Sequence, residues 1–168
     1  MKLHDQPLQF DAEQTRQIDR CLLHLADHAA SPLVMLADIS GRLVLYRGRV
    51  TTAQCTGLAA LAAGSFAAAR EIGTFLGLRE SFQQQLLEGR LANLYLLAVG
   101  TELLLVVAFT QQAMLGMVRL YAQDAQRELL ALAQAAIIAR EQGVYDVKHE
   151  VEAGFGDAVR KQLDEMFS

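Results

Sequence analysis

The sequence predicts a domain of the α/β class, of the α+β type, in which one mostly antiparallel five-stranded sheet carries helices on both faces. Three observations lead to this prediction. Apolar residues recur at helical spacing in three stretches, short apolar runs bounded by turn residues lie between them, and the last two runs are apolar almost throughout. Strands of that last kind are usually covered on both faces. The predicted order is therefore α-β-β-α-β-β-β-α, followed by a C-terminal tail.

The first helix is predicted to start after Asp11, whose side chain can cap it, with Gln14 as the capping-box partner. Its buried face is expected to carry Ile18, Leu22, Leu25 and Ala29. The Ser-Pro pair at 31–32 ends this helix. A β-hairpin follows, with strands over Leu33–Ala37 and Arg42–Tyr46. The turn at 38–41 offers an Asp that accepts from the backbone and a Gly that tolerates a positive φ.

The second helix is predicted to begin near Thr51–Thr52, where Thr can act as N-cap, and to end with Gly77 as the C′ residue. Half of the residues in Leu58–Gly77 are Ala or Gly. The larger side chains form a large stripe, predicted to lie on the sheet with Ser65 and Ala68 in its middle: Leu58, Leu61, Ile72, Phe75 and Leu76. A second stripe lies on another side of the same helix, with small residues in its middle and polar residues toward its C-terminal end. This small stripe comprises Ala60, Ala63, Gly64, Ala67, Arg70, Glu71 and Thr74.

The small stripe allows another backbone to approach the helix closely. One alternative is that Ala is used here only for its helix propensity, but Gly64 argues against it, because Gly costs roughly 1 kcal/mol relative to Ala inside a helix. Another alternative is that the stripe packs under a different element of the same chain. The other two long helices each show a single apolar stripe. We therefore favour an intermolecular surface.

Three further strands are predicted before the last helix. Within Ser81–Glu88, the alternation of Phe82, Gln84 and Leu86 indicates an edge strand, and the two apolar strands cover Leu91–Val99 and Glu102–Phe109. The last helix is expected over Gln112–Arg140, with Gly143 as its end. Its buried stripe comprises Leu115, Val118, Ala122, Ala125, Leu129, Leu132 and Ala136. The tail contains a short amphipathic piece with Val159, Leu163, Met166 and Phe167 on one face.

Composition narrows the range of partners. The chain has 168 residues, a hydrophobic fraction of 52% and a net charge of −4, which suit one folded domain. No block of Lys and Arg occurs, so we expect no nucleic-acid partner and no anionic membrane partner. No apolar run is long and uninterrupted enough for a membrane span, and the first ten residues have no export signal. Cys21 and Cys55 are interpreted as free thiols in a reducing, cytoplasmic setting.

Motifs for catalysis or cofactor binding are missing from the sequence. It has no phosphate-binding P-loop, no G-x-G-x-x-G after a strand and no nucleophile elbow. His24 and His28 have the i, i+4 spacing of a metal pair. However, a metalloprotease-type Glu and a third ligand are missing, so solvated histidines are the favoured interpretation. We expect no catalytic residue, no cofactor and no metal.

Several segments together carry a family resemblance: Ala37-Asp38-x-x-Gly41, 58–64 (LAALAAG), Leu76-Gly77, 93–95 (NLY), 103–107 (LLLVV) and 115–120 (LGMVRL). In this order and spacing they resemble the Roadblock/dynein light chain family over Ala12–Arg140. The resemblance implies a roadblock-like domain at 11–140, an N-terminal extension at 1–10 and a tail at 141–168. It also implies a homodimer, in which the edge strand pairs with its copy and the small-residue helix lies beside its own copy.

The resemblance is greatest to those prokaryotic members that offer the helix pair to a small Ras-like GTPase and accelerate its GTP hydrolysis. The resemblance therefore implies that this chain is a regulator without a catalytic site of its own. The implied GTPase contacts are Ala63 and Ala67, flanked by Ala60, Gly64, Arg70 and Glu71. The implied dimer contacts are Ala60, Phe82, Gln84 and Leu86. Arg70 is interpreted as a rim contact rather than an arginine finger, because fingers usually come from loops.

Two other functions stay open at this point. The chain could be a scaffold that binds a GTPase or another partner without altering nucleotide turnover. A less favoured alternative is a small-molecule sensor on the same fold. The activating and scaffold functions need the same helix surface, so the sequence does not separate them.

Overall fold

The computed structural model describes residues 6–167, with side chains for residues 6–143. Its elements follow the predicted order: α1 (Ala12–His28), β1 (Leu33–Asp38), β2 (Leu43–Gly48), α2 (Thr52–Phe75), β3 (Gln84–Glu88), β4 (Ala92–Val99), β5 (Leu103–Thr110) and α3 (Leu115–Phe167). The chain forms two compact units, Phe10–Ala133 and a second made of Met1–Gln9 with Gln134–Ser168. Among the described residues, no helix combines the length and the apolar character that crossing a bilayer requires.

The sheet lies in the unit Phe10–Ala133, and its strand order is β2-β1-β5-β4-β3. Every neighbouring pair of strands is antiparallel. The three central strands are almost entirely buried, whereas β2 and β3 form the edges and are largely half-buried or exposed. The predicted five-stranded sheet and its apolar central strands are therefore confirmed.

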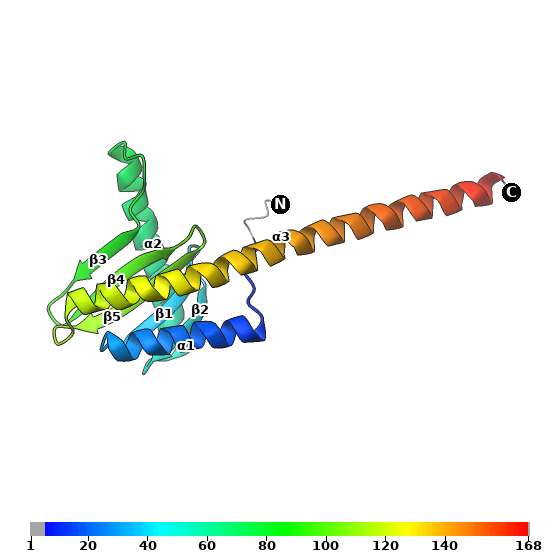
Figure 1. Ribbon diagram of the computed structural model, residues 1–168. Coiled ribbons are helices and arrows are strands. Elements are labelled where there is room, and N and C mark those ends of the chain that lie inside the picture. The colour runs from blue at the N-terminus through cyan, green and yellow to red at the C-terminus, as the bar shows by residue number, and fades with distance from the viewer. Residues whose placement is uncertain (1–5, 168) are drawn as a thin grey trace. The chain divides into compact units, whose positions relative to one another are not determined.

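Helices cover both faces of this sheet, as predicted (Figure 1). The first part of α3 and the whole of α1 lie over one face, and α2 lies over the other. Alternate residues of the central strands point to α2. They form one apolar cluster with that helix: Leu33, Met35, Ala37, Cys55, Ala59, Ala62, Phe66, Leu96, Ala98, Leu104 and Val106.

The caps read from the sequence are present. Asp11 accepts from the Gln14 backbone N–H at 2.8 Å, and the Asp11 N–H donates to the Gln14 side chain at 3.0 Å. Thr51 caps α2 in the same way, with a capping box to Gln54. Gly77 follows α2 with a φ of +67°, as a C′ residue should. On α1, the predicted residues Ile18, Leu22, Leu25 and Ala29 are all buried.

The placement of α2 differs from the prediction. The large stripe was expected on the sheet, but Leu61 is 74% exposed and Phe75 is 91% exposed, and Ile72 and Leu76 are also exposed. The face that packs on the sheet is instead Cys55, Ala59, Ala62, Ala63 and Phe66, and of the large stripe Leu58 packs half-buried against the same cluster. Each of these residues has another of the set three or four positions away, so together they form a continuous helical stripe of their own. The prediction was wrong because it ranked the stripes by side-chain size.

The predicted end of the last helix at Gly143 is also wrong, since α3 runs without interruption to Phe167. A single Gly inside a helix costs only about 1 kcal/mol relative to Ala, which its helix-forming neighbours can offset. The helix begins at Leu115 rather than Gln112. Most of its predicted stripe is buried, with Val118, Ala122, Ala125, Leu129 and Ala136 each at most 5% exposed. The apolar face proposed for 159–167 lies outside the described side chains.

One tight contact joins the β1–β2 turn to α2. Gly41 has a φ of +89°, and a Cβ on Gly41 would lie 2.8 Å from the Ala60 Cα atom. Only a glycine without a Cβ can let the turn lie this close to the helix. At Ala60, one position of the small stripe, the backbone that approaches closely belongs to the same chain.

We expect Gly41→Ala to lower the free energy of unfolding by about 1–3 kcal/mol, because the new methyl group meets backbone atoms and the φ is unfavourable. Urea denaturation followed by circular dichroism, at fixed protein concentration, would measure this. Gly57→Ala is the matched control, because Gly57 is helical and a Cβ there has no neighbour within 4 Å. That control should raise the free energy of unfolding by up to about 1 kcal/mol. Equal effects of the two substitutions would contradict the proposed constraint.

Candidate functional site

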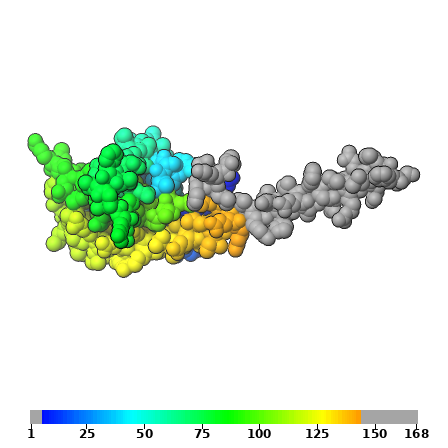
Figure 2. Space-filling view, turned by 90° about the horizontal axis from the view of Figure 1, so that it is seen from above, coloured from blue at the N-terminus to red at the C-terminus, as the bar shows by residue number. Residues whose placement is uncertain are grey.

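The outward side of α2 is the candidate site. The exposed members of the large stripe and most of the small stripe lie on it, and the end of the helix stands out on the face that Figure 2 shows. Monomeric proteins rarely leave several large apolar side chains exposed along one helix, so such a patch indicates a protein-binding surface.

A pocket of about 260 Å³ lies beside the small stripe. It brings together four of the six predicted GTPase contacts, namely Ala63, Ala67, Arg70 and Glu71, together with Thr74 of the same stripe. The remaining lining residues are Ile39, Phe66, Ser81 and Leu104. Ala63 is itself only 6% exposed, so it forms part of the floor. The pocket thus has an apolar floor and a rim that includes one arginine and one glutamate.

The other two predicted GTPase contacts lie outside this pocket. Ala60 faces the β1–β2 turn, as described above, and Gly64 is exposed with no atom within 4 Å of a would-be Cβ. A second pocket, of about 290 Å³, shares Phe66 and Arg70 with the first and is completed by Phe82, Gln83, Ala98, Gly100 and Thr101. Arg70 therefore lies between two hollows, at a helical position rather than on a loop.

Asp38 organises the turn that places Ile39 at the pocket. Its Oδ1 atom accepts from the Ser40 N–H at 2.9 Å, the Ser40 hydroxyl at 2.6 Å and the Arg42 N–H at 2.9 Å. Its Oδ2 atom accepts from Arg42 Nε at 2.7 Å. Burial alone raises the pKa of this carboxyl, but the hydrogen bonds from Ser40 and Arg42 and the Arg42 charge outweigh burial and lower it. Its interpretation as a turn residue is confirmed.

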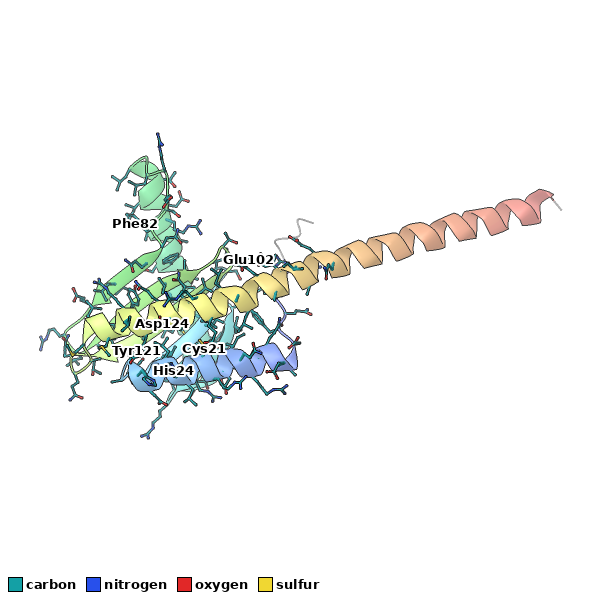
Figure 3. All side chains as sticks on the ribbon, in the orientation of Figure 1. Cys21, His24, Phe82, Glu102, Tyr121 and Asp124 are labelled. Atoms are coloured by element: carbon teal, nitrogen blue, oxygen red, sulfur yellow. The ribbon has the colours of Figure 1, made fainter. Side chains whose placement is uncertain are left out.

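Three of the four predicted dimer contacts lie on or just before the edge strand β3. Phe82 packs on the helix, since its ring atoms are about 3.6 Å from where a Cβ on Gly73 would be, and Figure 3 places Phe82 beside α2. Gln84 is exposed, but its side chain accepts a hydrogen bond from the Tyr95 hydroxyl. Leu86 is half-buried and lies opposite Tyr95 in the β3–β4 ladder. The structure therefore brings Gln84 and Leu86 to a free edge, while Ala60 lies at the β1–β2 turn.

The free edge of β3 has a defined set of hydrogen-bond donors. Ala98 N–H donates to Gln83 O at 2.9 Å, so the 83–98 pair is a hydrogen-bonded pair of the antiparallel ladder. Such pairs alternate along the strands. Gln85 and Leu87 therefore direct their backbone groups to β4, whereas Gln84, Leu86 and Glu88 direct theirs to the open side. A strand from a second chain would form its backbone hydrogen bonds with these three residues.

Sequence reasoning missed the exposed large stripe as a site. The Thr51 cap fixes where α2 starts, and Cys55, Ala59, Ala62 and Phe66 follow it at helical spacing. The cap does not distinguish this stripe from the large stripe, which has helical spacing too, so the sequence alone could not assign Leu61, Ile72 and Phe75 to the outer side.

The described residues offer little catalytic chemistry. Both cysteines are free and buried, and burial, with Glu128 nearby, raises the pKa of the Cys21 thiol to about 12. Burial also raises the pKa of Cys55. Neither thiol is therefore an activated nucleophile. Among residues with described side chains, no group of three or more His, Cys, Asp or Glu could hold a metal ion.

Comparison with known proteins defines the class. The Roadblock/LC7 domain profile matches residues 20–109, more than half of the chain. The protein therefore belongs to the Roadblock/LC7 family. No curated protein sequence matches the chain.

Among solved structures, the chain is similar to Myxococcus xanthus MglB, with 32% identity, coverage of 71% of this chain and 96% of that chain, and a TM-score of 0.67. It is also similar to the gliding protein MglB from Thermus thermophilus, with 25% identity, coverage of 77% and 98%, and a TM-score of 0.72. A Roadblock/LC7 domain from Streptomyces avermitilis shares the fold at 19% identity and a TM-score of 0.56, covering 70% of this chain and 92% of its own.

The Asp38 turn gives a pH prediction. Because the folded state lowers the pKa of Asp38, its contribution to stability is present above the ordinary aspartate pKa of about 3.9 and is lost as pH falls through the folded value. Asp38→Asn should therefore destabilise the protein at pH 7, and the difference from wild type should shrink on acidification to about pH 3. Urea unfolding at both pH values measures this.

Asp27→Asn is the matched control for the pH prediction, since Asp27 is an exposed carboxylate on α1. This substitution should change the free energy of unfolding only slightly at either pH. A destabilisation by Asp38→Asn that stays constant between the two pH values would show that the carboxylate charge does not stabilise the turn.

Proposed function

We propose that this protein is a homodimeric regulator that binds a small Ras-like GTPase through α2 and accelerates its GTP hydrolysis. The observation that carries the proposal is the uncovered outer side of α2, which combines exposed large apolar residues with the pocket lined by the small stripe. Membership of the Roadblock/LC7 family and similarity to MglB structures support it. Because one of these structures is a gliding protein, the proposal includes a role in cell polarity and motility.

In this proposal the two stripes of α2 contact different partners. The large stripe packs against the same helix of a second copy, since Leu61, Ile72 and Phe75 are too apolar to stay exposed. The GTPase contacts the small stripe, where Ala67 and the pocket it borders can accept an apolar side chain between Arg70 and Glu71. Gly64 and Ala60 flank this contact, and Ala63 contributes the floor. Pairing of β3 with its copy, through Gln84 and Leu86, completes the dimer.

Acceleration without catalytic residues is physically reasonable. GTP hydrolysis needs an oriented water and positive charge at the γ-phosphate. A partner that binds more tightly to the arrangement in which the GTPase's own switch residues are in place raises the population of that arrangement. Such a partner needs a shaped surface rather than a nucleophile or a base. Arg70 contributes a rim contact, because a side chain in the middle of a helix reaches a buried phosphate poorly.

The first test uses Ala67→Arg, an exposed position at which Arg and Ala have similar helix propensity. The large charged side chain should block the pocket and weaken GTPase binding about ten-fold or more, a change of about 1.4 kcal/mol or more. GTP hydrolysis by the Ras-like GTPase encoded nearest to this gene, with excess protein, provides the measurement, and gel filtration reports binding. Ala53→Arg, exposed near the start of the same helix, is the matched control and should behave as wild type.

Three outcomes are informative in this test. Stimulation by wild type and Ala53→Arg but not by Ala67→Arg supports the proposal. Equal stimulation of GTP hydrolysis by all three proteins would show that the GTPase binds a surface other than the one at Ala67. Binding by wild type without faster hydrolysis supports a scaffold or adaptor instead.

The second test concerns the dimer. Leu86→Pro removes a backbone N–H that points to the open side of β3, so the intrachain ladder with β4 should survive while pairing with a second copy is lost. Light scattering coupled to gel filtration should show a monomer with native-like circular dichroism. Leu86→Thr keeps the N–H and should remain dimeric. A dimeric Leu86→Pro protein would contradict pairing through this edge.

A further inference from the structure

Arg70 is shared by two neighbouring hollows under α2. The first hollow, of about 260 Å³, and the second, of about 290 Å³, have only Phe66 and Arg70 in common. Their floors lie side by side, because Leu104 of the first hollow and Ala98 of the second are paired across the β4–β5 ladder. Paired residues on adjacent antiparallel strands are about 5 Å apart. One segment of a partner can therefore fill both hollows.

The Arg70 guanidinium has no ion-pair or hydrogen-bond partner among the residues with described side chains. Of the described residues that line the second hollow, Arg70 alone is charged. The first hollow also has Glu71, but successive residues diverge by about 100° around a helix axis, and the two side chains do not pair. An unpaired cation between two hollows with apolar floors favours an anionic group on the partner.

The polar groups around Arg70 fit a carboxylate. A guanidinium matches a carboxylate with two parallel N–H···O bonds. Ser81 lines the first hollow and Thr101 the second, and a hydroxyl can donate a further hydrogen bond to an anion. Phosphorylated segments are usually recognised by a cluster of arginines. Among the described lining residues of the two hollows, Arg70 is the one basic residue, so the chemistry favours Asp or Glu.

We propose that the GTPase segment that docks here carries an Asp or Glu side chain for Arg70, with an apolar side chain for each hollow. This inference rests on the proposed function and names the chemistry that the site selects. Apolar walls lower the local dielectric, so the ion pair contributes more than an exposed surface pair. A partner without the carboxylate would cover Arg70 and leave its charge unpaired, which lowers affinity. Arg70 is thus a docking and specificity residue.

Arg70→Gln tests the ion pair, because it removes the charge and keeps a polar side chain. The probe is the Ras-like GTPase encoded nearest to this gene, loaded with a fluorescent non-hydrolysable GTP analogue and titrated by anisotropy. Affinity should fall about ten-fold or more, as expected when a charge-assisted hydrogen-bonded pair is lost. Binding should also become less sensitive to salt. Arg90→Gln, the same exchange at an exposed position between β3 and β4, is the matched control and should bind as wild type.

A charge exchange identifies the carboxylate on the partner. Arg70→Glu should bind the GTPase more weakly than Arg70→Gln, because it places two carboxylates together. Replacing the contacting Asp or Glu of the GTPase by Arg should then restore binding to Arg70→Glu, and the double-mutant cycle gives the coupling between the two residues.

Hydrolysis rates separate docking from a direct role in the reaction. With Arg70→Gln, the protein concentration needed for half-maximal stimulation should rise with the loss of affinity. The maximal rate should stay within about two-fold of wild type, whereas removal of an arginine finger would lower it about 10³-fold or more.

The outcomes distinguish this inference from the proposed function. A wild-type protein that does not bind the GTPase would contradict both. Wild-type binding together with an unchanged affinity and salt dependence of Arg70→Gln would overturn the carboxylate pairing alone. A loss of maximal rate at unchanged affinity would also overturn it, since Arg70 would then act on the reaction rather than on docking.

Discussion

The packing of α2 on the sheet depends on small residues at the contact. Ala59, Ala62 and Ala63 are nearly inaccessible and let the helix axis lie close to the strands, while Phe66 supplies a large buried side chain and Leu58 packs half-buried beside it. Gly41 extends the close approach to the neighbouring turn. A helix seated this closely has no room for Leu61, Ile72 or Phe75 on its inner side. The exposed apolar surface of α2 is therefore a consequence of how α2 packs.

Much of the fold could be predicted because its signals are local. The caps at Asp11 and Thr51, the turn at 38–41 and the apolar runs of β4 and β5 depend on residues close in sequence, and the structure has all of them. The orientation of α2 depends instead on which stripe the sheet can accommodate, and that is a tertiary property. Side-chain size was a poor guide, since a closely packed face selects small residues. The continuity of α3 through Gly143 was missed because a helix-breaking residue was given more weight than its modest energetic cost.

Part of the candidate site could also be predicted, because that part depends on residues close together in the sequence. The small stripe was recognised from its composition, and the pocket brings four of its six predicted contacts together. The pocket itself could not be predicted, because Ile39 and Leu104 reach it from segments that are distant in sequence. Ala60 was predicted only as a contact to other molecules. In the structure it also lies against the turn at Gly41 of its own chain. Composition thus identified the helix, and tertiary structure determined what each position on it contacts.

The geometry of one helix bears on whether the proposed dimer and the proposed GTPase contact can coexist. At about 100° per residue, Ile72 lies within about 20° of Leu61 around the α2 axis, whereas Ala67 lies about 240° from Leu61 in the same sense. A second copy packed on the large stripe would therefore leave the Ala67 side of the helix uncovered. The pocket beside Ala67 has its own walls, Ile39 and Leu104, from the same chain. Dimerisation and GTPase binding then use different sides of α2, so the dimer can present the pocket without having to dissociate, and any coupling between the two events must be reciprocal.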